Sequence, residues 1–534
     1  MNQLQTDILI VGGGVGGCAA ALAAAASGVN VILTEESDWL GGQLTSQAAP
    51  PDEHGWIEEF GCTRSYRRMR NAVRDFYRAN YPLSEKAKAN PFLNPGDGWV
   101  SPLCAEPRVF LKVIEAMLVE SVERGSLRVL TEHFPAAAET ENNKVRRVTL
   151  KNLATGEDVA ISAKYFIDAT ELGELLPLTE TEFVTGAESK AETGEPNAKE
   201  ISEPRNTQAF SVCFAVSFHE GENHTIEPPE NYAFWREFVP DLTPAWSGKL
   251  LNLTGINPRT GQPSTYNFAP HREENKAFAG LWTYRRIRHR ENFAARAFDS
   301  DITLINYPQI DYFIEDLSNA AGYEEKRRLI AEAKQLSLSF LYWLQTAAGF
   351  AGLKLRKDVV GTGDGLAKMP YIRESRRIKA EFTVCEQHVS AAARPHQTFA
   401  APFFDTVGIG CYRIDLHPTC GGDNYVDVEA LPFQIPLGAL IPRTTENLLA
   451  GGKNIGTTHI TNGCYRLHPV EWNIGEAAGS LAAFCLEKNA PPSEVRNDAK
   501  LLGEFQSVLA KNGVELEWRK DLKLVEGDPH RHAA

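Results

Sequence analysis

The sequence predicts an α/β fold in which two distant parts of the chain share one parallel sheet, with an α+β domain inserted between them. Two observations favour this fold. Residues 7–35 contain an apolar strand, a glycine-rich turn, an alanine-rich helix and a second strand. Residues 447–486 return to a strand, a glycine-rich turn and a helix of small residues. Strands that alternate with helices are typical of a parallel sheet covered by helices.

The first glycine-rich turn has the spacing of a phosphate cradle. Gly12, Gly14 and Gly17 follow the apolar run 8–11 in G-x-G-x-x-G register, and Gly16 lies between them. This spacing allows a tight turn and a close approach of the backbone to a pyrophosphate. The helix that follows presents unpaired N–H groups and a positive dipole end to that anion. The turn therefore predicts a Rossmann-like dinucleotide site.

The residues after the second strand indicate which dinucleotide binds. Glu35 ends that strand, where a carboxylate can accept hydrogen bonds from a ribose diol. The next segment, Trp39-Leu40-Gly41-Gly42-Gln43, resembles the L-G-G segment that follows the ribose acid in many two-dinucleotide-binding-domain flavoproteins. The resemblance implies FAD, with Gly41, Gly42 and Gln43 beside it.

Composition is that of a large enzyme that does not bind nucleic acid. The chain has 534 residues, is 43% hydrophobic and carries a formal net charge of −14. This acidic balance gives no electrostatic support for nucleic-acid binding. One basic run, residues 285–290, is interpreted as a solvated face or an anion contact.

Targeting and metal-binding signals are missing from the sequence. The first strand begins by residue 7 without a preceding basic region, so no cleavable signal peptide fits, and no apolar run is long enough for a membrane helix. We therefore expect a cytoplasmic protein. The nine cysteines include no C-x-x-C pair, which argues against a zinc site, a redox dithiol or an iron–sulfur cluster.

The expected organisation is discontinuous. We expect the first part of an FAD-binding domain in residues 1–180 and its C-terminal part in residues 400–490. Residues 205–400 carry their own aromatic-rich segments and predict a cap or substrate domain, and 491–534 predict a helical extension. The acidic segment 180–204 is interpreted as a surface loop or linker.

Two further segments are expected at the cofactor. Asp168-Ala169-Thr170-Glu171 resembles the A-T-G turn that returns the chain to the cofactor in flavoproteins, and Glu171 stands where glycine is usual. In the C-terminal segment, a helix is expected to begin at 473 and to point its positive end at the pyrimidine side of the flavin. The cofactor residues expected from these segments are Ala169, Thr170, Gly452, Asn454, Gly475, Ala477 and Ala478.

The motifs together resemble the FAD-dependent oxidoreductase family related to the fumarate reductase and succinate dehydrogenase flavoproteins. Besides the cradle and the A-T turn, the resemblance rests on Tyr371–Arg377, Asp415-Leu416-His417-Pro418, Ile435-Pro436-Leu437 and the NLLAGGKNIG…EAAG ending. It covers nearly the whole chain. It implies an FAD domain built from both ends, with the intervening part lying over the flavin.

Four residues are candidates for catalysis. Arg466 is the first choice, because it is expected in a loop over the flavin face and matches an arginine of the family pattern. His417 is a candidate proton donor or acceptor, and the alternative of equal weight is a loop histidine that bonds only the backbone. Arg373 and Arg376 lie three residues apart and can hold a carboxylate or a flavin oxygen, or form an interdomain salt bridge instead.

The predicted reaction is hydride transfer between a small organic substrate and flavin N5, and the arginines favour a carboxylate. Alkene reduction of the fumarate reductase type would use the same residues in reverse. Because no second glycine fingerprint is visible, the electron partner is expected to be oxygen, a quinone or another protein. The alternatives from other classes are a tRNA-modifying flavoprotein and a non-catalytic flavin-binding protein. No metal site is expected.

Overall fold

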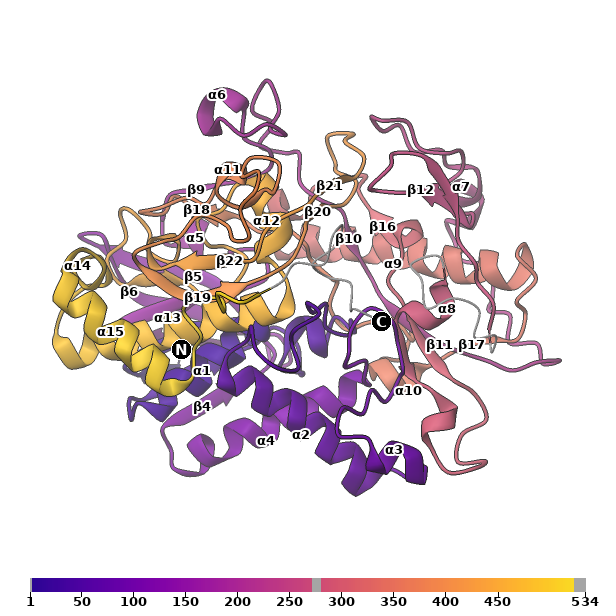
Figure 1. Cartoon of the computed structure of the whole chain (residues 1–534), viewed down its shortest axis with the longest axis horizontal. Coiled ribbons are helices and arrows are strands. Elements are labelled where there is room, and N and C mark those ends of the chain that lie inside the picture. Colours follow the sequence, from indigo (N-terminus) through magenta and orange to yellow (C-terminus); the bar gives the residue numbers. More distant parts are fainter. Residues whose placement is uncertain (1, 271–279, 523–534) are drawn as a thin grey trace.

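The computed structural model describes residues 2–270 and 280–522. It divides into a larger body built from the two ends of the chain and a second body built from its middle. In Figure 1 the indigo, purple and yellow elements form the first body, and most of the pink elements form the second. The α/β fold predicted from the sequence is confirmed.

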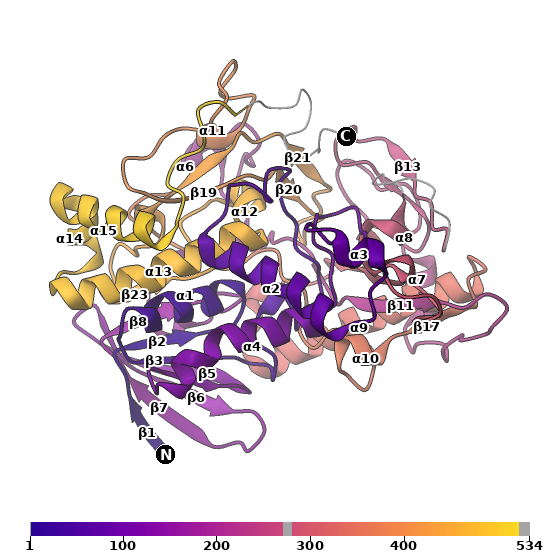
Figure 2. The ribbon, with the colours of Figure 1, turned by 60° about the horizontal axis from the view of Figure 1, so that its bottom comes forward.

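The central sheet joins the two ends of the chain. Its five parallel strands lie in the order β23 (Leu448–Ala450), β8 (Tyr165–Asp168), β2 (Ile8–Val11), β3 (Val31–Thr34) and β4 (Leu127–Leu130). Strands β23, β2 and β3 are fully buried and β8 is buried from its second residue, as expected of apolar runs covered on both faces, whereas in the edge strand β4 only Leu127 is buried. A second sheet, of β1 (Asn2–Gln5), β7 (Asp158–Ser162), β6 (Lys144–Asn152) and β5 (His133–Glu141), lies beside it (Figure 2).

Helices α1 (Val15–Ala26) and α13 (His468–Lys488) pack against each other without intervening side chains. An added Cβ at Gly475 would lie 1.9 Å from the carbonyl oxygen of Gly16, and one at Gly479 would lie 2.2 Å from that of Ala20. Four residues further along α1, the contact lies four residues further along α13, so the two helices run parallel. The glycines therefore bring the N-terminal and C-terminal parts of the chain into one unit.

Two more helices cover the same region (Figure 2). Helix α2 (Arg64–Asn80) begins at the N-cap Thr63, whose side chain accepts a hydrogen bond from the N–H of Tyr66. Helix α4 (Pro107–Glu123) begins with proline in its first turn, where the missing N–H costs nothing. Arg70 of α2 is fully buried and forms an ion pair with Glu53 at 2.8 Å.

The second body has its own hydrophobic core. Its antiparallel sheet has the order β14 (Arg286–Arg288), β15 (Ile302–Ile305), β11 (Phe214–Phe218) and β17 (Leu353–Leu355), and the long helix α9 (Tyr323–Thr346) contributes to the same core. Most members of this core come from residues 209–372, whereas buried residues in 378–400 belong to the core of the first body. The cap domain expected over 205–400 stays a prediction, and its packing ends near residue 372.

Shorter elements connect these layers. They include α5 (Leu175–Leu178), β9 (Phe183–Val184), α6 (Lys190–Thr193), β10 (Phe210–Ser211), α7 (Tyr232–Glu237), β12 (Thr254–Ile256), β13 (Pro263–Thr265), α8 (Leu281–Tyr284), β16 (Asp311–Tyr312), α10 (Lys357–Val360), β18 (Arg377–Ile378), α11 (Glu386–Val389), β19 (Thr406–Gly410), β20 (Ile414–Leu416), β21 (Val426–Val428), β22 (Phe433–Pro436), α12 (His459–Tyr465), α14 (Pro492–Asn497), α15 (Ala499–Asn512) and α3 (Glu85–Ala89). None of the helices in the described part of the chain combines the length and hydropathy needed to cross a lipid bilayer.

The close packing of α1 and α13 predicts the effect of a single methyl group. Gly475→Ala should force the two helices apart, lower the free energy of unfolding by about 1–3 kcal/mol and reduce the amount of bound FAD. Chemical unfolding and the flavin absorbance of the purified protein measure both effects. Gly503→Ala is the matched control, because a Cβ there meets nothing within 4 Å. In the interior of α15 it should stabilise the protein by about 0.5–1 kcal/mol. Equal stabilities of the two variants would contradict the packing argument.

Candidate functional site

The glycine turn of the first body forms the expected cradle. Gly12 has φ of 100°, and a Cβ on it would lie 2.2 Å from the carbonyl oxygen of Ala169. Only glycine fits here, because the turn after β8 lies directly against it. Gly41 also has a positive φ, of 102°, and its N–H donates to the carbonyl oxygen of Gly13 at 2.7 Å. The two glycine segments and the turn at 168–171 therefore form one backbone surface.

Glu35 lies at the end of β3, as expected. Its Oε2 accepts from the N–H of Gly13 at 2.8 Å, and its Oε1 accepts from the N–H and hydroxyl of Ser37 at 3.0 and 2.9 Å. Burial raises the pKa of this carboxyl to about 7. Glu35 thus positions the glycine turn and also lines the cavity beside it.

Glu171 occupies the place where the cradle would hold an anion. Its Oε1 lies 2.7 Å from the position of a Cβ on Gly14 and 2.9 Å from that of a Cβ on Gly42. Among the described residues this buried oxygen has no hydrogen-bond partner. The other oxygen, Oε2, pairs with Lys453, which also pairs with Glu471 at 3.1 Å. A carboxylate therefore lies at the N-terminus of α1, where a helix dipole attracts negative charge.

One cavity collects several of the expected cofactor residues. It is lined by parts of β2, the glycine turn, the end of β3, the turn after β8 and residues of the second body. The expected residues among its lining are Gly12, Gly14, Glu35, Gly42, Ala169 and Thr170. Gln43 lies next to them, and its Nε2 donates to the carbonyl oxygen of Arg466 at 3.2 Å and to Glu471 at 3.3 Å. The structure therefore brings these residues together.

The helix expected to begin at residue 473 begins earlier. Helix α13 starts at His468 with Pro469 in its first turn, so the proline and not the small residues marks the helix start. Gly475 lies inside the helix and packs on Gly16, and Ala477 and Ala478 are fully buried in the same core. The small residues therefore serve helix packing, and the prediction of the helix start was wrong.

The longer α13 reaches beyond α1. Gly16 pairs with Gly475, so α13 extends six residues further at its N-terminal end than α1, which is roughly 9 Å at 1.5 Å per residue. Two other expected residues lie beneath this end. Asn454 donates from Nδ2 to the carbonyl oxygen of Asp168 at 2.9 Å and accepts from the N–H of Gly452 at 3.2 Å. They hold the end of β23 against the turn after β8.

Three of the four candidate catalytic residues lie in one buried cluster of charges. Oδ1 of Asp311 of β16 forms an ion pair with Nη2 of Arg373 at 3.0 Å, and its other oxygen bonds Nδ1 of His417 at 2.6 Å. Burial favours the protonated acid, but Arg373 and His417 outweigh it and lower the pKa of Asp311. Asp311 is therefore a carboxylate that orients His417. The rings of His417 and Tyr425 pack edge to face, with centroids 5.4 Å apart.

Arg466 joins the cluster through a second acid. It is the C-cap residue of α12, just before α13, and donates from Nη2 to the carbonyl oxygen and to Oδ2 of Asp415 at 3.1 and 3.0 Å. Oδ2 of Asp415 is also 3.7 Å from Nε2 of His417. Burial opposes ionisation, but His417 and Arg466 hold the pKa of Asp415 well below its usual range. The two acids therefore bracket His417.

Arg285 adds a third guanidinium from the second body. Its Nη1 is 3.5 Å from Oδ2 of Asp52, a loose contact for an ion pair. Asp52 donates its backbone N–H to Nδ1 of His468 at 3.1 Å, so a neutral His468 carries its proton on Nε2. Burial, and then Arg285, Lys453 and Arg466, hold the pKa of His468 far below the usual value. The first residue of α13 is therefore a neutral hydrogen-bond donor.

Arg376 lies apart from this cluster. It donates from Nη1 to the carbonyl oxygen of Leu172 at 2.9 Å, and its guanidinium lies over the ring of Phe183 at 6.0 Å. The two arginines of the 373–376 pair therefore point to different places.

The basic run at 285–290 is not a solvated face. Arg286 and Arg288 are buried, and they pair with Asp301 at 3.1 Å and with Glu106 at 2.7 Å. Alternation along β14 turns these two side chains toward acids of neighbouring segments, and Arg285 faces Asp52. The solvated-face interpretation was wrong, because the run contributes the buried strand β14.

Several buried polar atoms around the cluster have no hydrogen-bond partner among the described residues. Buried polar groups are normally paired, so unpaired ones concentrated in one region indicate a place for a ligand. These atoms are Oε1 of Gln43, Oε1 of Gln47, Nε of Arg285, Nδ2 of Asn306, Nε of Arg373, the hydroxyl of Tyr425, Nε of Arg466 and Nε2 of His468.

Sequence reasoning missed the acids of the cluster. Asp52, Asp311 and Asp415 come from three distant segments, and nothing in the local sequence distinguishes Asp52 or Asp311. Arg285 was visible only as part of the basic run. Asp415 had a usable signal, since it stands two residues before His417 in an extended segment, where alternate side chains share a face.

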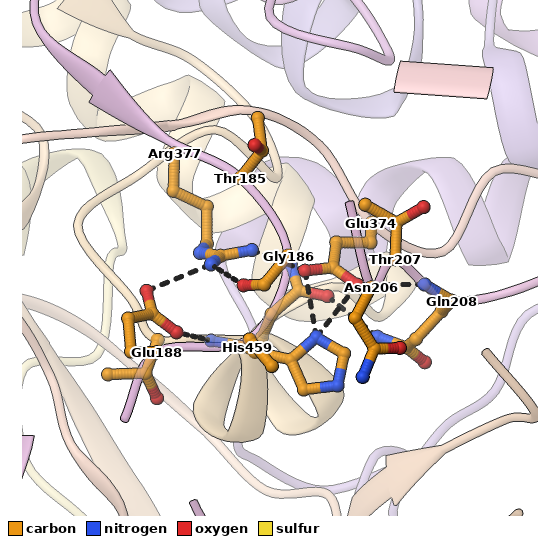
Figure 3. A network of polar contacts seen from close by, with 12 residues as sticks. Thr185, Gly186, Glu188, Asn206, Thr207, Gln208, Glu374, Arg377 and His459 are labelled. Atoms are coloured by element: carbon orange, nitrogen blue, oxygen red, sulfur yellow. Dashed lines mark hydrogen bonds and ion pairs between the residues drawn. The ribbon is translucent and has the colours of Figure 1, made fainter. Parts of the chain in front are cut away.

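A second polar network lies on α12 (Figure 3). Nδ1 of His459 lies 2.9 and 3.0 Å from the two oxygens of Glu374, and its backbone N–H donates to Glu188 at 2.9 Å. Arg377 pairs with both Glu374 and Glu188. Burial raises the pKa of Glu374, but His459 and Arg377 more than reverse this and lower it to about 2. Glu374 is therefore ionised, and it pairs with Arg377 and His459 rather than with Arg373.

The sequence matches a family model described as FAD dependent oxidoreductase over residues 7–509. The chain belongs to this family. Membership confirms FAD as the cofactor and an FAD-dependent oxidoreductase as the class of enzyme. No curated protein matches the chain.

Similar solved structures are distant. A geranylgeranyl bacteriochlorophyll reductase-like protein of Thermoplasma acidophilum is 11% identical, with 96% of this chain and 85% of that chain covered and a TM-score of 0.31. A variant of quinol fumarate reductase FrdA from E. coli is 12% identical, with 96% and 74% covered and a TM-score of 0.32. An L-proline dehydrogenase of P. horikoshii is 16% identical, with 35% and 24% covered and a TM-score of 0.18, so this chain spans about a quarter of that protein. None of these likenesses carries a substrate assignment.

The residues present fit FAD. The cradle at Gly12 excludes side chains, and the buried Glu171 carboxylate stands where the pyrophosphate would bind. Glu35 and the backbone of Gly41 to Gln43 would adjoin the ribose and the chain of the cofactor, and the N-terminus of α13 would face its flavin. Lys453 provides a cation between these two ends.

The position of Glu171 predicts competition with FAD. Glu171→Gln should tighten FAD binding about tenfold, because it removes a negative charge from the anion site while Lys453 remains. Fluorescence titration of the FAD-free protein measures the dissociation constant. Glu157→Gln, in an exposed turn, should change nothing. Weaker binding in Glu171→Gln would mean that Glu171 mainly positions Lys453 for the cofactor.

The low pKa of Glu374 predicts a pH-dependent loss of stability. The folded protein lowers this pKa from 4.5 to about 2, which contributes about 3 kcal/mol that is complete above pH ~4.5 and is lost as the pH falls toward 2. Glu374→Gln should therefore lower the free energy of unfolding by that amount at pH 7, and the difference from wild type should shrink at pH 3. Urea unfolding at the two pH values tests this. Glu59→Gln, an exposed position, should change stability by less than about 0.5 kcal/mol.

Proposed function

We propose that the protein transfers a hydride between a small, carboxylate-bearing organic substrate and FAD, with His417 moving the accompanying proton. The observation that carries the proposal is the buried chain Arg373–Asp311–His417, bracketed by the Asp415–Arg466 pair. It lies where segments of the first and second bodies meet. FAD, when bound, supplies a two-electron acceptor or donor at N5.

His417 is suited to proton transfer. Asp311 accepts the Nδ1 proton, so Nε2 is left to accept a proton from the substrate or to return one. The backbone N–H of His417 donates to Oε1 of Gln208 at 3.2 Å, which fixes the loop that carries the ring. Asp311 and Gln208 are therefore positioning residues, and His417 is the group that exchanges the proton.

Arg285 and Arg466 are suited to bind the substrate's anionic group. Both have buried N–H groups without a partner among the described residues, and a carboxylate accepts two parallel hydrogen bonds from a guanidinium. They enter the cluster from opposite bodies. A carboxylate held between them would also close the boundary between the bodies and exclude water from His417.

The same residues serve the reverse reaction, in which a protonated His417 would deliver a proton to an activated alkene. Oxygen, a quinone or another protein is the proposed electron partner. A cytoplasmic location stays a prediction.

Anaerobic absorbance spectra test the proposal. Among amines, hydroxy acids and unsaturated carboxylates, we expect one class with a carboxylate to bleach the flavin, and admitted air then distinguishes oxygen from another acceptor. Reoxidation of reduced flavin by an unsaturated carboxylate would instead assign an alkene reductase. If no compound of this panel exchanges electrons with bound FAD, the proposed substrate class is contradicted and the alternative of a non-catalytic flavin-binding protein gains support.

Variants of the cluster give a sharper prediction. His417→Gln should slow bleaching by about 10²–10⁴-fold with unchanged FAD content, because the proton acceptor is gone. Asp311→Asn should slow it less and change its pH profile, since it alters the orientation and charge state of the ring. His224→Gln, a histidine outside the cluster, is the control and should behave as wild type. An unchanged rate in His417→Gln would remove His417 from the chemistry.

A further inference from the structure

A second cavity lies beside the network of Figure 3 and outside the cluster around His417. Its volume is about 110 Å³. The walls come from the segment 187–199, from Thr243 and Pro244, from 416–426 and from the start of α12. Four segments that are far apart in the sequence therefore meet around one space.

The segment 180–204, expected as a surface loop or linker, is docked in this wall. Ala187 and Ala198 are 3% and 7% exposed. Glu195 accepts from the hydroxyl of Thr458 at 2.6 Å, and Thr458 is the N-cap of α12. Opposite, the backbone of Thr243 bonds Gly422 and Asn424 at 2.8 and 2.9 Å. The cavity is therefore held by fixed backbone on both sides.

His459 turns one ring nitrogen away from the protein's own network. Its Nδ1 is engaged by Glu374, whereas Nε2 has no hydrogen-bond partner among the described residues. In Figure 3 that nitrogen points away from Glu374, Arg377 and Glu188. Since His459 lines the cavity, its second nitrogen is available to a ligand there.

The charges on the wall balance. Arg377 pairs with Glu188 at 2.9 Å and also with Glu374, and His459 pairs with Glu374 at 2.9 Å. Burial lowers the pKa of His459, but Glu374 outweighs it and raises this pKa, so Arg377 and a cationic His459 together balance the two acids.

Asp423 is neutralised by Lys199 at 2.7 Å. Lys199 and Asp423 are the more exposed pair, with side chains 31% and 27% exposed, so they mark the mouth. An isolated anion or cation gains no net attraction in such a site. A neutral ligand can use acids and cations alike as hydrogen-bond partners.

The remaining wall suits hydroxyl groups. The cavity is also lined by Asn197, Thr243, Thr419, Asn424 and Tyr425. The amide nitrogens of Asn197 and Asn424 bond Glu386 and the carbonyl oxygen of Pro244, but the Thr419 hydroxyl, which accepts from the N–H of Asp423, keeps its own proton for a ligand, and the Tyr425 hydroxyl has no partner among the described residues.

A cavity of ~150 Å³ holds the six non-hydrogen atoms of benzene, so this one, at about 110 Å³, encloses about four or five, and the rest of a larger ligand would extend into the mouth. We propose that the cavity binds a neutral polyhydroxylated group of the size of a triol, with His459 as its central hydrogen-bonding partner.

The site is independent of the proposed chemistry, although it adjoins it. Leu416 and Tyr425 line the cavity and flank His417 in sequence or in space. Glycerol binding can be measured without any turnover. A failure of the hydride-transfer proposal would therefore leave this inference standing, and the reverse also holds.

Glycerol tests the inference by saturation-transfer difference NMR on the FAD-loaded protein. Wild type should transfer saturation to glycerol and not to acetate. Ala198→Leu fills part of the cavity while the His459 side chain is retained, and it should reduce the glycerol signal about tenfold. Ala154→Leu, the same change at an exposed turn, should leave it unchanged, and so should His417→Gln.

His459→Leu supplies a second test, because it removes the free nitrogen while Arg377 stays paired with Glu374 and Glu188. It should also lower the glycerol signal about tenfold. If this variant does not fold, Ala198→Leu still decides. Equal glycerol signals in wild type and Ala198→Leu would overturn the proposal. A stronger signal for acetate than for glycerol would overturn the neutral ligand class.

Discussion

The backbone contact between α1 and α13 is the constraint on which the rest of the structure depends. Because glycine carbonyls and α-carbons meet directly, the helices run parallel and their positive ends face the same edge of the sheet. The six-residue offset between them then separates an anion site at the cradle from a second helix end at His468. Without that contact the C-terminal segment would not carry Arg466 and His468 to the residues of the N-terminal half.

The cluster around His417 depends on both bodies. Isolated buried charges are costly, so Asp311, Asp415 and Asp52 are tolerated only because a guanidinium or imidazole accompanies each. Asp311 and Arg285 come from the middle of the chain, and the others come from its ends or from the boundary. Charge compensation therefore links the packing of the two bodies to the protonation state of the site.

The sequence predicted the parts of the site that depend on local backbone geometry. The strand and glycine spacing around Gly12 and the acid at Glu35 can be read directly, because phosphate approach needs glycine at fixed intervals. The start of α13 was misplaced, since small residues signal close packing as readily as a helix end. The partner that Arg373 and His417 share could not be predicted, because Asp311 is brought to them only by the fold of the second body. The burial of Arg285 likewise follows from tertiary packing, and no local sequence pattern predicts it.

Gln208 connects the two polar regions through three hydrogen bonds. Its backbone N–H donates to Glu374 at 3.0 Å, its Oε1 accepts from the N–H of His417, and its Nε2 donates to Asn462 of α12 at 3.3 Å. Each bond fixes a different segment, so moving the His417 loop would leave a buried amide unpaired, at a cost of about 1–3 kcal/mol. The network on α12 therefore fixes the backbone of His417 through Gln208, while Asp311 fixes the orientation of the ring through Nδ1.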